Sequence, residues 1–294
     1  MLETVQRPEF RTPIDPLGPI YLLLESEALE DYLRARPGAA DQPSAHAEVR
    51  DIDYCTFARW VWSGTEYEPY AARGPLLVRC EGRSPLLDVF RNEWAAHDVG
   101  LMIRTPAGMD EVLTHLRGIL FVELAGDGPA RFRLQEPLAL ASVLRALAPQ
   151  RAAALLGPLQ ELVWRENNGP THQWWRHSQD EAEGASTGFV FTPAELAAID
   201  AGLAERFEQT QVALTEQATH QTYENARLQV LLWMDQLKGW GYLSQGELAA
   251  ALDVLRHPRF AAESNRLLPV LQDTGQSVAA RLTSAQHHLD MQGA

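Results

Sequence analysis

Short apolar runs alternate with amphipathic segments of about ten residues through the first half of this 294-residue chain. Apolar runs of this length, bounded by turn-forming residues, are typical of buried strands, and the segments between them are typical of helices that cover a sheet. A Gly-Asp-Gly turn at residues 126–128 predicts a hairpin, so the sheet is expected to be mixed rather than purely parallel. The predicted strands are residues 19–25, 74–80, 99–105, 119–124 and 130–134.

The pattern changes near Arg165. Residues 166–188 are polar and aperiodic, which predicts a loop. After a short strand, a capping box at Thr192–Glu195 and another at Ser244–Glu247 predict the starts of amphipathic helices. The sequence therefore predicts an α/β (α+β) fold with an N-terminal mixed-sheet lobe at residues 1–165, a linker at 166–188 and an all-helical lobe at 189–294.

The charge balance is acidic, with a formal net charge of −14. The parts before and after Arg165 are both acidic, so neither provides the broad basic face that nucleic-acid binding requires. Two cysteines, Cys55 and Cys80, are too few for a disulfide framework and lack metal-ligand spacing, which fits a reducing cytoplasm. No signal peptide and no apolar run of the roughly 20 residues that span a bilayer is recognised. We expect a soluble, cytoplasmic protein.

Residues Gly184–Gly188 read GASTG, which matches the G-x-S-x-G pattern of serine hydrolases. A nucleophile elbow needs a strand before the serine and a helix after it, because that turn exposes the hydroxyl. Here an acidic loop precedes Ser186 and a short strand follows it. We therefore interpret GASTG as a solvated loop between the lobes, with a hydrolase using Ser186 as the alternative.

A second chemical candidate is the pair His172 and His177, followed by Asp180. Two imidazoles and a carboxylate are suitable ligands for a divalent metal, but this spacing fits no strong metal signature. Glycine-rich phosphate loops are absent from the sequence. We expect no catalytic residue, no metal and no cofactor, and keep a His172/His177 metal hydrolase as the alternative.

Aromatic and arginine residues suggest protein contacts instead. Trp174, Trp175 and Arg176 follow one another in the segment predicted to be a loop, and these residue types are enriched in binding hot spots. Arg131 and Arg133 alternate on a predicted strand, which places both guanidinium groups on one face, where they can pair with an acidic partner. We take these five residues as candidate partner-binding residues; the alternatives are core packing for the tryptophans and surface ion pairs for the arginines.

Five stretches between residues 21 and 165 form a distinctive ordered series. They are YLLLESEAL (21–29), EPYAARGPLLVRC (68–80), SPLLDVFRNEWAAHDVGLMIRTPAGMDEVLTHLRGILFVEL (84–124), ARFRLQEPLALASVLRAL (130–147) and LLGPLQELVWR (155–165). This series resembles the Tap-type effector adaptors, or effector chaperones, of bacterial type VI secretion. In that family an apolar strand is followed by an acidic residue, then a "GPyLv" strand, a Trp-containing helix, a "H-L-R" helix and a "FRfyDPrvL" segment. Gln135, Glu136 and Leu138 depart from the last of these.

The resemblance implies a non-enzymatic, cytoplasmic protein that binds a type VI effector, commonly through the N-terminal segment of the effector, and helps load it onto the VgrG spike. It implies no cofactor; the acidic charge and the short apolar runs lead us to expect no nucleic-acid and no membrane partner. An immunity or scaffold protein of the same gene cluster is a further alternative.

Overall fold

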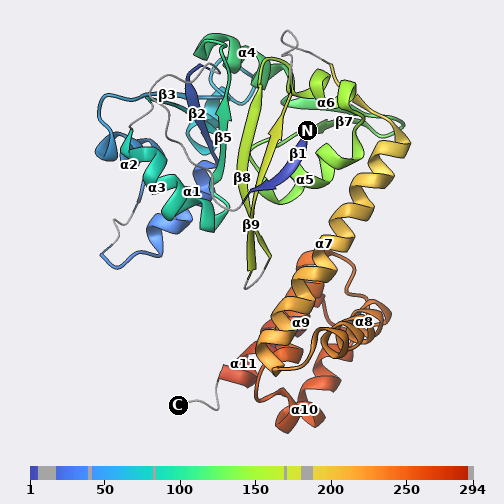
Figure 1. The fold of residues 1–294 in the computed structure, drawn as a ribbon. Coiled ribbons are helices and arrows are strands. Elements are labelled where there is room, and N and C mark those ends of the chain that lie inside the picture. Colours follow the sequence, from blue (N-terminus) through green and yellow to red (C-terminus); the bar gives the residue numbers. More distant parts are fainter. Residues whose placement is uncertain (6–17, 39–41, 82–83, 169–170, 180–187, 291–294) are drawn as a thin grey trace. The chain divides into compact units, whose positions relative to one another are not determined.

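A computed structural model describes residues 1–5, 18–38, 42–81, 84–168, 171–179 and 188–290 (Figure 1). The chain divides into two compact units. Unit 1 comprises Met1–Asn167 and His172–Leu203, and unit 2 comprises Asn168–Thr171 and Ala204–Ala294. No described helix combines the length and apolarity needed to cross a membrane.

The centre of unit 1 is a seven-stranded sheet in the order β1-β9-β8-β5-β2-β4-β3. The strand pairs with a described register are all antiparallel. The predicted fold class, an α/β lobe followed by a helical region, is confirmed. The strands are β1 (Leu2–Val5), β2 (Ile20–Leu24), β3 (Phe57–Trp60), β4 (Leu76–Cys80), β5 (Gly100–Arg104), β8 (Glu161–Asn168) and β9 (Thr171–Ser178).

Both faces of this sheet are covered, which explains why its central strands read as continuous apolar runs. In β2, Tyr21 and Leu23 point into one core, and Leu22 and Leu24 point into the other. Helices α1, α2 and α3 cover the face that carries Leu22, whereas α4, α5 and α6 cover the opposite face (Figure 1). Unit 1 is therefore a layered sandwich with two separate cores.

Several helices of unit 1 begin at a side-chain cap or an early proline. The side-chain oxygen of Ser84 accepts a hydrogen bond from the Leu86 amide at 3.3 Å, and Pro85 occupies the first turn of α3. The helices are α1 (Ser26–Arg34), α2 (Ala45–Ile52), α3 (Pro85–Asn92), α4 (Met109–Gly118), α5 (Pro137–Ala146) and α6 (Pro149–Leu156), with the short 3₁₀ helices η1 (Glu68–Arg73) and η2 (Trp94–His97).

A second, three-stranded sheet has the order β10-β6-β7 and consists of β6 (Phe121–Leu124), β7 (Gly128–Arg131) and β10 (Val190–Phe191). The Gly-Asp-Gly hairpin is confirmed: β6 and β7 are antiparallel, and Gly126 and Gly128 adopt φ values of +98° and +84°. Strand β10 pairs with β6 in parallel. The mixed pairing expected from the sequence therefore occurs in this small sheet, not in the large one.

The start of α7 (Pro193–Thr219) is held in unit 1 by Glu195. Its carboxylate accepts two hydrogen bonds from the Arg151 guanidinium, both at 2.9 Å, and one from the Thr192 amide at 2.8 Å. The Thr192 hydroxyl oxygen in turn accepts a hydrogen bond from the Glu195 amide at 3.2 Å. The predicted capping box is confirmed, and Arg151 connects it to α6.

Unit 2 contains the rest of α7 and α8 (Tyr223–Gly239), α9 (Gln245–Arg256), α10 (Phe260–Gln272) and α11 (Val278–Asp290). The second capping box, between Ser244 and Glu247, is also confirmed. Buried Arg281 donates hydrogen bonds to the carbonyls of Trp240 and Leu271, both at 2.8 Å, and its guanidinium lies 4.6 Å from the centre of the Tyr242 ring. Described residues from 193 to 290 are thus helical or in the turns between helices.

A segment that was predicted to be a loop carries regular structure. Strands β8 (Glu161–Asn168) and β9 (Thr171–Ser178) reach into the range 166–188, where the linker was expected. Ser186 and most of GASTG lie outside the described residues.

Candidate partner-binding site

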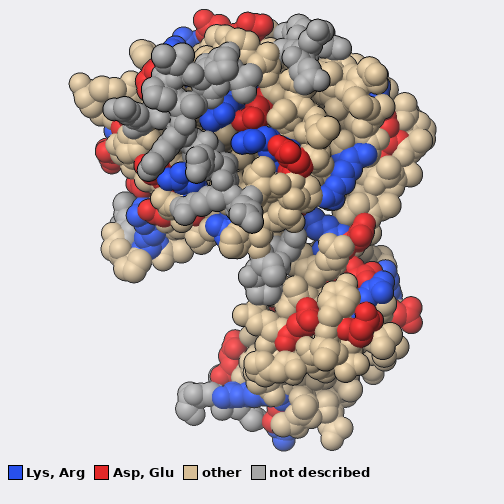
Figure 2. All heavy atoms as spheres, in the orientation of Figure 1, with Lys and Arg blue, Asp and Glu red and all other residues tan. Residues whose placement is uncertain are grey.

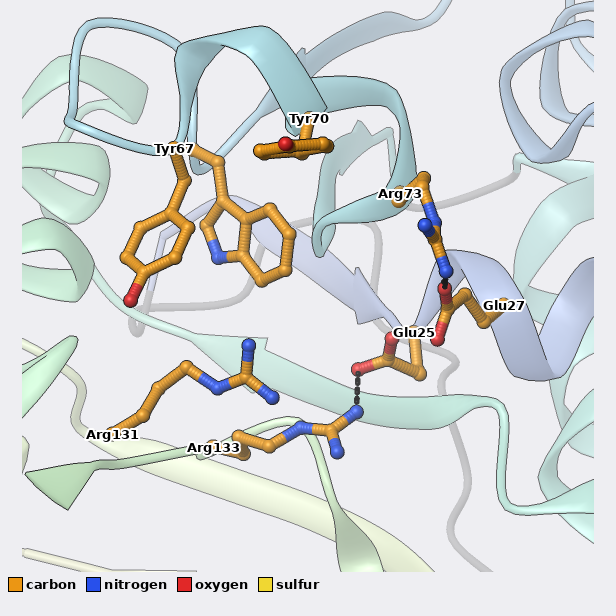
Figure 3. A pocket seen from close by; sticks show the side chains of 8 residues that line it. Glu25, Glu27, Tyr67, Tyr70, Arg73, Arg131 and Arg133 are labelled. Carbon is orange, nitrogen blue, oxygen red and sulfur yellow. Dashed lines mark hydrogen bonds and ion pairs between the residues drawn. The ribbon is translucent and has the colours of Figure 1, made fainter.

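Unit 1 contains a pocket of about 310 Å³ that combines aromatic and charged side chains (Figure 3). We call it the arginine–aromatic pocket. Its lining comes from the end of β2 and start of α1, the segment from β3 through η1, and the end of β7. The lining residues are Glu25, Glu27, Trp62, Tyr67, Tyr70, Arg73, Arg131 and Arg133.

The aromatic side of the pocket follows from the way the chain leaves β3. The Val61 amide still donates to the Pro75 carbonyl at 2.9 Å, and the chain then turns and reaches η1. The rings of Trp62 and Tyr67 are 5.2 Å apart between centres. Gly74 makes this packing possible, because a Cβ atom there would lie 2.4 Å from Trp62 Cδ2. The close approach of the Gly74 backbone therefore holds the Trp62 ring in position.

The basic side of the pocket is formed at the end of β7. Arg131 and Arg133 both extend into the pocket, opposite Tyr67 and Tyr70 (Figure 3). The two guanidinium groups line the same pocket, but not by alternation on one strand as expected, because β7 ends at Arg131 and Arg133 lies beyond it. The Arg131 guanidinium carbon lies 5.6 Å from the centre of the Trp62 ring, a cation–π distance.

Glu25 holds the segment after β7 against the end of β2. Its side chain is 9% exposed; the carboxylate accepts a hydrogen bond from the Gln135 amide group at 2.7 Å and pairs with Arg133 at 3.1 Å. The Glu25 backbone amide donates to the Val99 carbonyl at 2.6 Å. A buried carboxylate needs such partners because burial removes it from water. Glu25 is the acidic residue that follows the first apolar strand in the resemblance, and Gln135 is one of the departures from it.

The charges that line and border the pocket are largely paired. Arg133 pairs with Glu25 at 3.1 Å and with Glu136, beside the pocket, at 2.5 Å, and the Arg73 guanidinium donates to the Glu27 carboxylate at 2.6 Å and 2.9 Å. For Arg131, no carboxylate of a described residue lies within 4.0 Å. Burial raises the pKa of Glu136 above its ordinary value, against the opposing effects of Arg133 and Arg131. Arg131 is therefore the lining arginine without a described carboxylate at ion-pair distance, although the charge of Glu136 acts on it.

Trp174 and Trp175 lie elsewhere, in β9, and are core residues. They are 4% and 9% exposed, and they point to opposite faces of the large sheet because they are adjacent on a strand. The rings of Trp174 and Phe90 pack edge to face, with 6.4 Å between their centres. Trp175 Nε1 donates a hydrogen bond to the Glu166 carboxylate at 2.9 Å. The interpretation of these tryptophans as members of an exposed loop is corrected: buried indoles cannot meet a partner directly.

Arg176 is engaged within the sheet and not in the pocket. Its guanidinium lies 3.4 Å from the carboxylate of Glu161 and 3.7 Å from that of Glu3. The same Glu161 carboxylate lies 3.5 Å from the guanidinium of Arg104. These pairs neutralise charges on neighbouring strands, so of the five residues proposed from the sequence only Arg131 and Arg133 meet in one site.

The histidine pair proposed as a metal site does not converge. His172 is exposed and His177 is buried, and five positions along β9 place their side chains on opposite faces. Burial lowers the pKa of His177 to about 4. Asp180 lies outside the described residues, and in the described part of the chain no three or more His, Cys, Asp or Glu side chains are grouped to hold a metal ion.

Other hollows carry fewer features of a recognition site. A hollow of about 500 Å³ in unit 2 lies between α9 and α11 and has His287 and Asp290 as its charged or titratable lining. Another, of about 390 Å³, lies between α1 and α2. On the face drawn in Figure 2, lysine and arginine side chains are interspersed with aspartate and glutamate, without a broad basic surface.

The comparison with protein families gives one finding. Residues 38–154 match the model described as "Domain of unknown function (DUF4123)". A DUF4123 domain is present. Comparison with curated proteins and with solved structures finds no match.

The DUF4123 domain contributes six of the eight residues that line the pocket, from Trp62 to Arg133, whereas Glu25 and Glu27 precede it. Sequence reasoning singled out Arg131 and Arg133 but did not identify the aromatic side of the pocket. The density of aromatic residues in 60–70 was the available signal. Nothing in the sequence alone indicates that this segment faces Arg131.

Proposed function

We propose that this protein is a non-enzymatic adaptor, or chaperone, that binds a type VI secretion effector and helps load it onto the VgrG spike. It acts in the bacterial cytoplasm, and it engages the effector through the N-terminal segment of that effector. The observation that carries the proposal is the arginine–aromatic pocket, which presents hot-spot residue types on a rigid α/β frame. The DUF4123 domain that contains most of this pocket, together with the ordered series of motifs, supports the secretion role.

The chemistry of the pocket fits recognition of a polypeptide. Tyr67 and Tyr70 offer flat amphipathic surfaces with few rotatable bonds, and arginine offers several hydrogen-bond donors in one plane. Tyr70 is 59% exposed, although its ring borders the pocket. A large exposed aromatic beside an arginine that has no described carboxylate at ion-pair distance is typical of a binding anchor.

The test begins with co-purification. The full chain, carrying an affinity tag, is expressed with the effector and the spike encoded beside it, and both are expected to be captured. Deletion of the gene is expected to abolish delivery of that effector into competitor cells. If the chain captures neither protein and delivery is unchanged in the deletion strain, the adaptor role is refuted. Protection of the producing cell from the effector, without capture of the spike, would instead indicate an immunity protein.

A matched pair of tyrosine variants tests the pocket. Tyr70→Ala removes an exposed ring that lines it, and Tyr54→Ala removes a ring that is 79% exposed outside it. Removal of an interface anchor costs about tenfold or more in affinity. We expect Tyr70→Ala, and not Tyr54→Ala, to weaken effector binding by that factor in a titration. Equal affinities of the two variants would contradict a role for this pocket.

A further inference from the structure

Arg131 differs from the other two arginines of the pocket in the groups that its guanidinium contacts. Arg73 pairs with Glu27, and Arg133 pairs with both Glu25 and Glu136. The Arg131 guanidinium lies over the Trp62 ring, and its side chain is exposed. Stacking uses the face of a guanidinium and leaves the N–H groups at its edge available. Arg131 is thus a donor group held in place by an aromatic ring, with its hydrogen-bonding edge available.

The surroundings determine which acceptor fits. Glu25 and Glu136 pair with Arg133, and Glu27 pairs with Arg73, so Arg131 is the lining arginine that remains available to pair directly with an added carboxylate. A planar guanidinium matches a carboxylate with two parallel hydrogen bonds. The pocket is small, about 310 Å³, which suits individual side chains rather than a folded surface. Tyr67 and Tyr70, opposite the arginines, favour an apolar or aromatic group next to the carboxylate (Figure 3).

We propose that the arginine–aromatic pocket binds a single carboxylate together with an adjacent aromatic or apolar side chain from an extended segment of a partner polypeptide, with Arg131 as the donor to the carboxylate. The choice of a polypeptide as ligand rests on the adaptor function proposed above. Glu25 is a positioning residue in this site, because its contacts with Gln135 and Arg133 hold the end of β7 in place. The carboxylate comes from an aspartate or glutamate side chain or from a chain terminus.

Short peptides of known chemistry test this without knowledge of the effector. The first probe is the tetrapeptide Gly-Glu-Phe-Gly with an acetylated N-terminus and an amidated C-terminus. The second replaces its glutamate by glutamine. The third is acetylated Gly-Gln-Phe with a free terminal carboxylate. Binding of each probe to the full chain is detected by saturation-transfer NMR and quantified by competition with the first probe.

Protein variants provide the matched controls. Arg131→Gln removes the charge, Arg131→Lys retains it without the planar fork, and Arg34→Gln removes an exposed arginine of α1 that pairs with Asp31 outside the pocket. Circular dichroism and the urea midpoint establish that each variant is folded. We expect the glutamate probe to bind about tenfold more tightly than the glutamine probe. Arg131→Gln is expected to remove that difference, Arg131→Lys to reduce it, and Arg34→Gln to leave it unchanged.

The outcomes separate this inference from the adaptor function. Equal binding of the glutamate and glutamine probes, an undiminished preference in Arg131→Gln, or absence of binding by all three probes overturns the carboxylate site, while capture of the effector by the wild-type chain still supports the adaptor. Preference for the third probe over the second, dependent on Arg131, assigns the site to a chain terminus. Preference for the first alone assigns it to an acidic side chain.

Discussion

Replacement of Glu195 by glutamine is expected to destabilise unit 1 and to remove part of its pH dependence. The hydrogen bonds from Arg151, and those from Thr192, lower the pKa of the Glu195 carboxyl from its ordinary 4.5 to about 2. Because the folded-state pKa lies below the ordinary value, the stabilisation is complete above pH 4.5 and is lost as the pH falls towards 2. The glutamine side chain has nearly the same shape but no charge.

The magnitude follows from the same contacts. The difference between the two pKa values corresponds to an upper limit of about 3 kcal/mol in unfolding free energy. Glu195 is 12% exposed but Arg151 is 37% exposed, so solvent screens the pair. We therefore expect a loss of about 1–2 kcal/mol at pH 7. At pH 3 the wild-type chain has lost more than half of this contribution, so the gap between variant and wild type narrows accordingly.

Urea unfolding followed by tryptophan fluorescence measures this difference, since six of the eight tryptophans belong to unit 1. Asp31→Asn is the control, because both side chains of the Asp31–Arg34 ion pair are exposed and the pair contributes little to the unfolding free energy. A gap between Glu195→Gln and wild type that is as large at pH 3 as at pH 7 would refute the electrostatic reasoning. If Glu195→Gln were as stable as wild type at pH 7, the stabilising role of the Glu195–Arg151 contact would be refuted.

Three other substitutions probe packing. Gly74→Ala places a Cβ against the Trp62 ring and should cost about 1–3 kcal/mol in urea unfolding while it weakens binding in the pocket; unchanged stability and binding would show that Trp62 relocates freely. At Gly157 the backbone φ is +52°, and an added Cβ would lie 2.5 Å from His115 Cε1. Gly157→Ala should therefore lower the unfolding free energy, measured in the same way, by more than Gly74→Ala does; the reverse order would contradict this. Tyr242→Phe leaves a buried carbonyl of α10 with one donor fewer and should lower the thermal midpoint of unit 2 by an amount equivalent to about 1 kcal/mol, and an unchanged midpoint would count against that bond.

The central strands of unit 1 and the capped helices were predictable because local rules decide them. Strand β2 is apolar at every position since both of its faces are covered. The capping boxes at Thr192 and Ser244 signal helix starts through short-range hydrogen bonds. The order of the strands was not predictable, because antiparallel pairing of β2 with both β4 and β5 depends on contacts between distant segments.

The hairpin of β8 and β9 was missed for a physical reason. The sequence of β9 does not alternate between polar and apolar residues. The adjacent indoles of Trp174 and Trp175 enter different cores, and the charge of Arg176 is compensated by Glu161. Such compensated charges look like loop residues when only hydropathy is considered. In the pocket, the spacing of Arg131 and Arg133 was informative, but Glu25 and Tyr70 come from other segments and are brought there only by the fold.

The adjacent tryptophans of β9 have a consequence for strand register. A slip of one residue exchanges the two faces of a strand, so each indole would enter the core shaped for the other. The slip would also separate Trp175 Nε1 from the Glu166 carboxylate that now accepts its hydrogen bond at 2.9 Å. The pairing of β9 is therefore locked from both sides of the sheet at once. This strand cannot slide along its neighbours without disturbing two cores together.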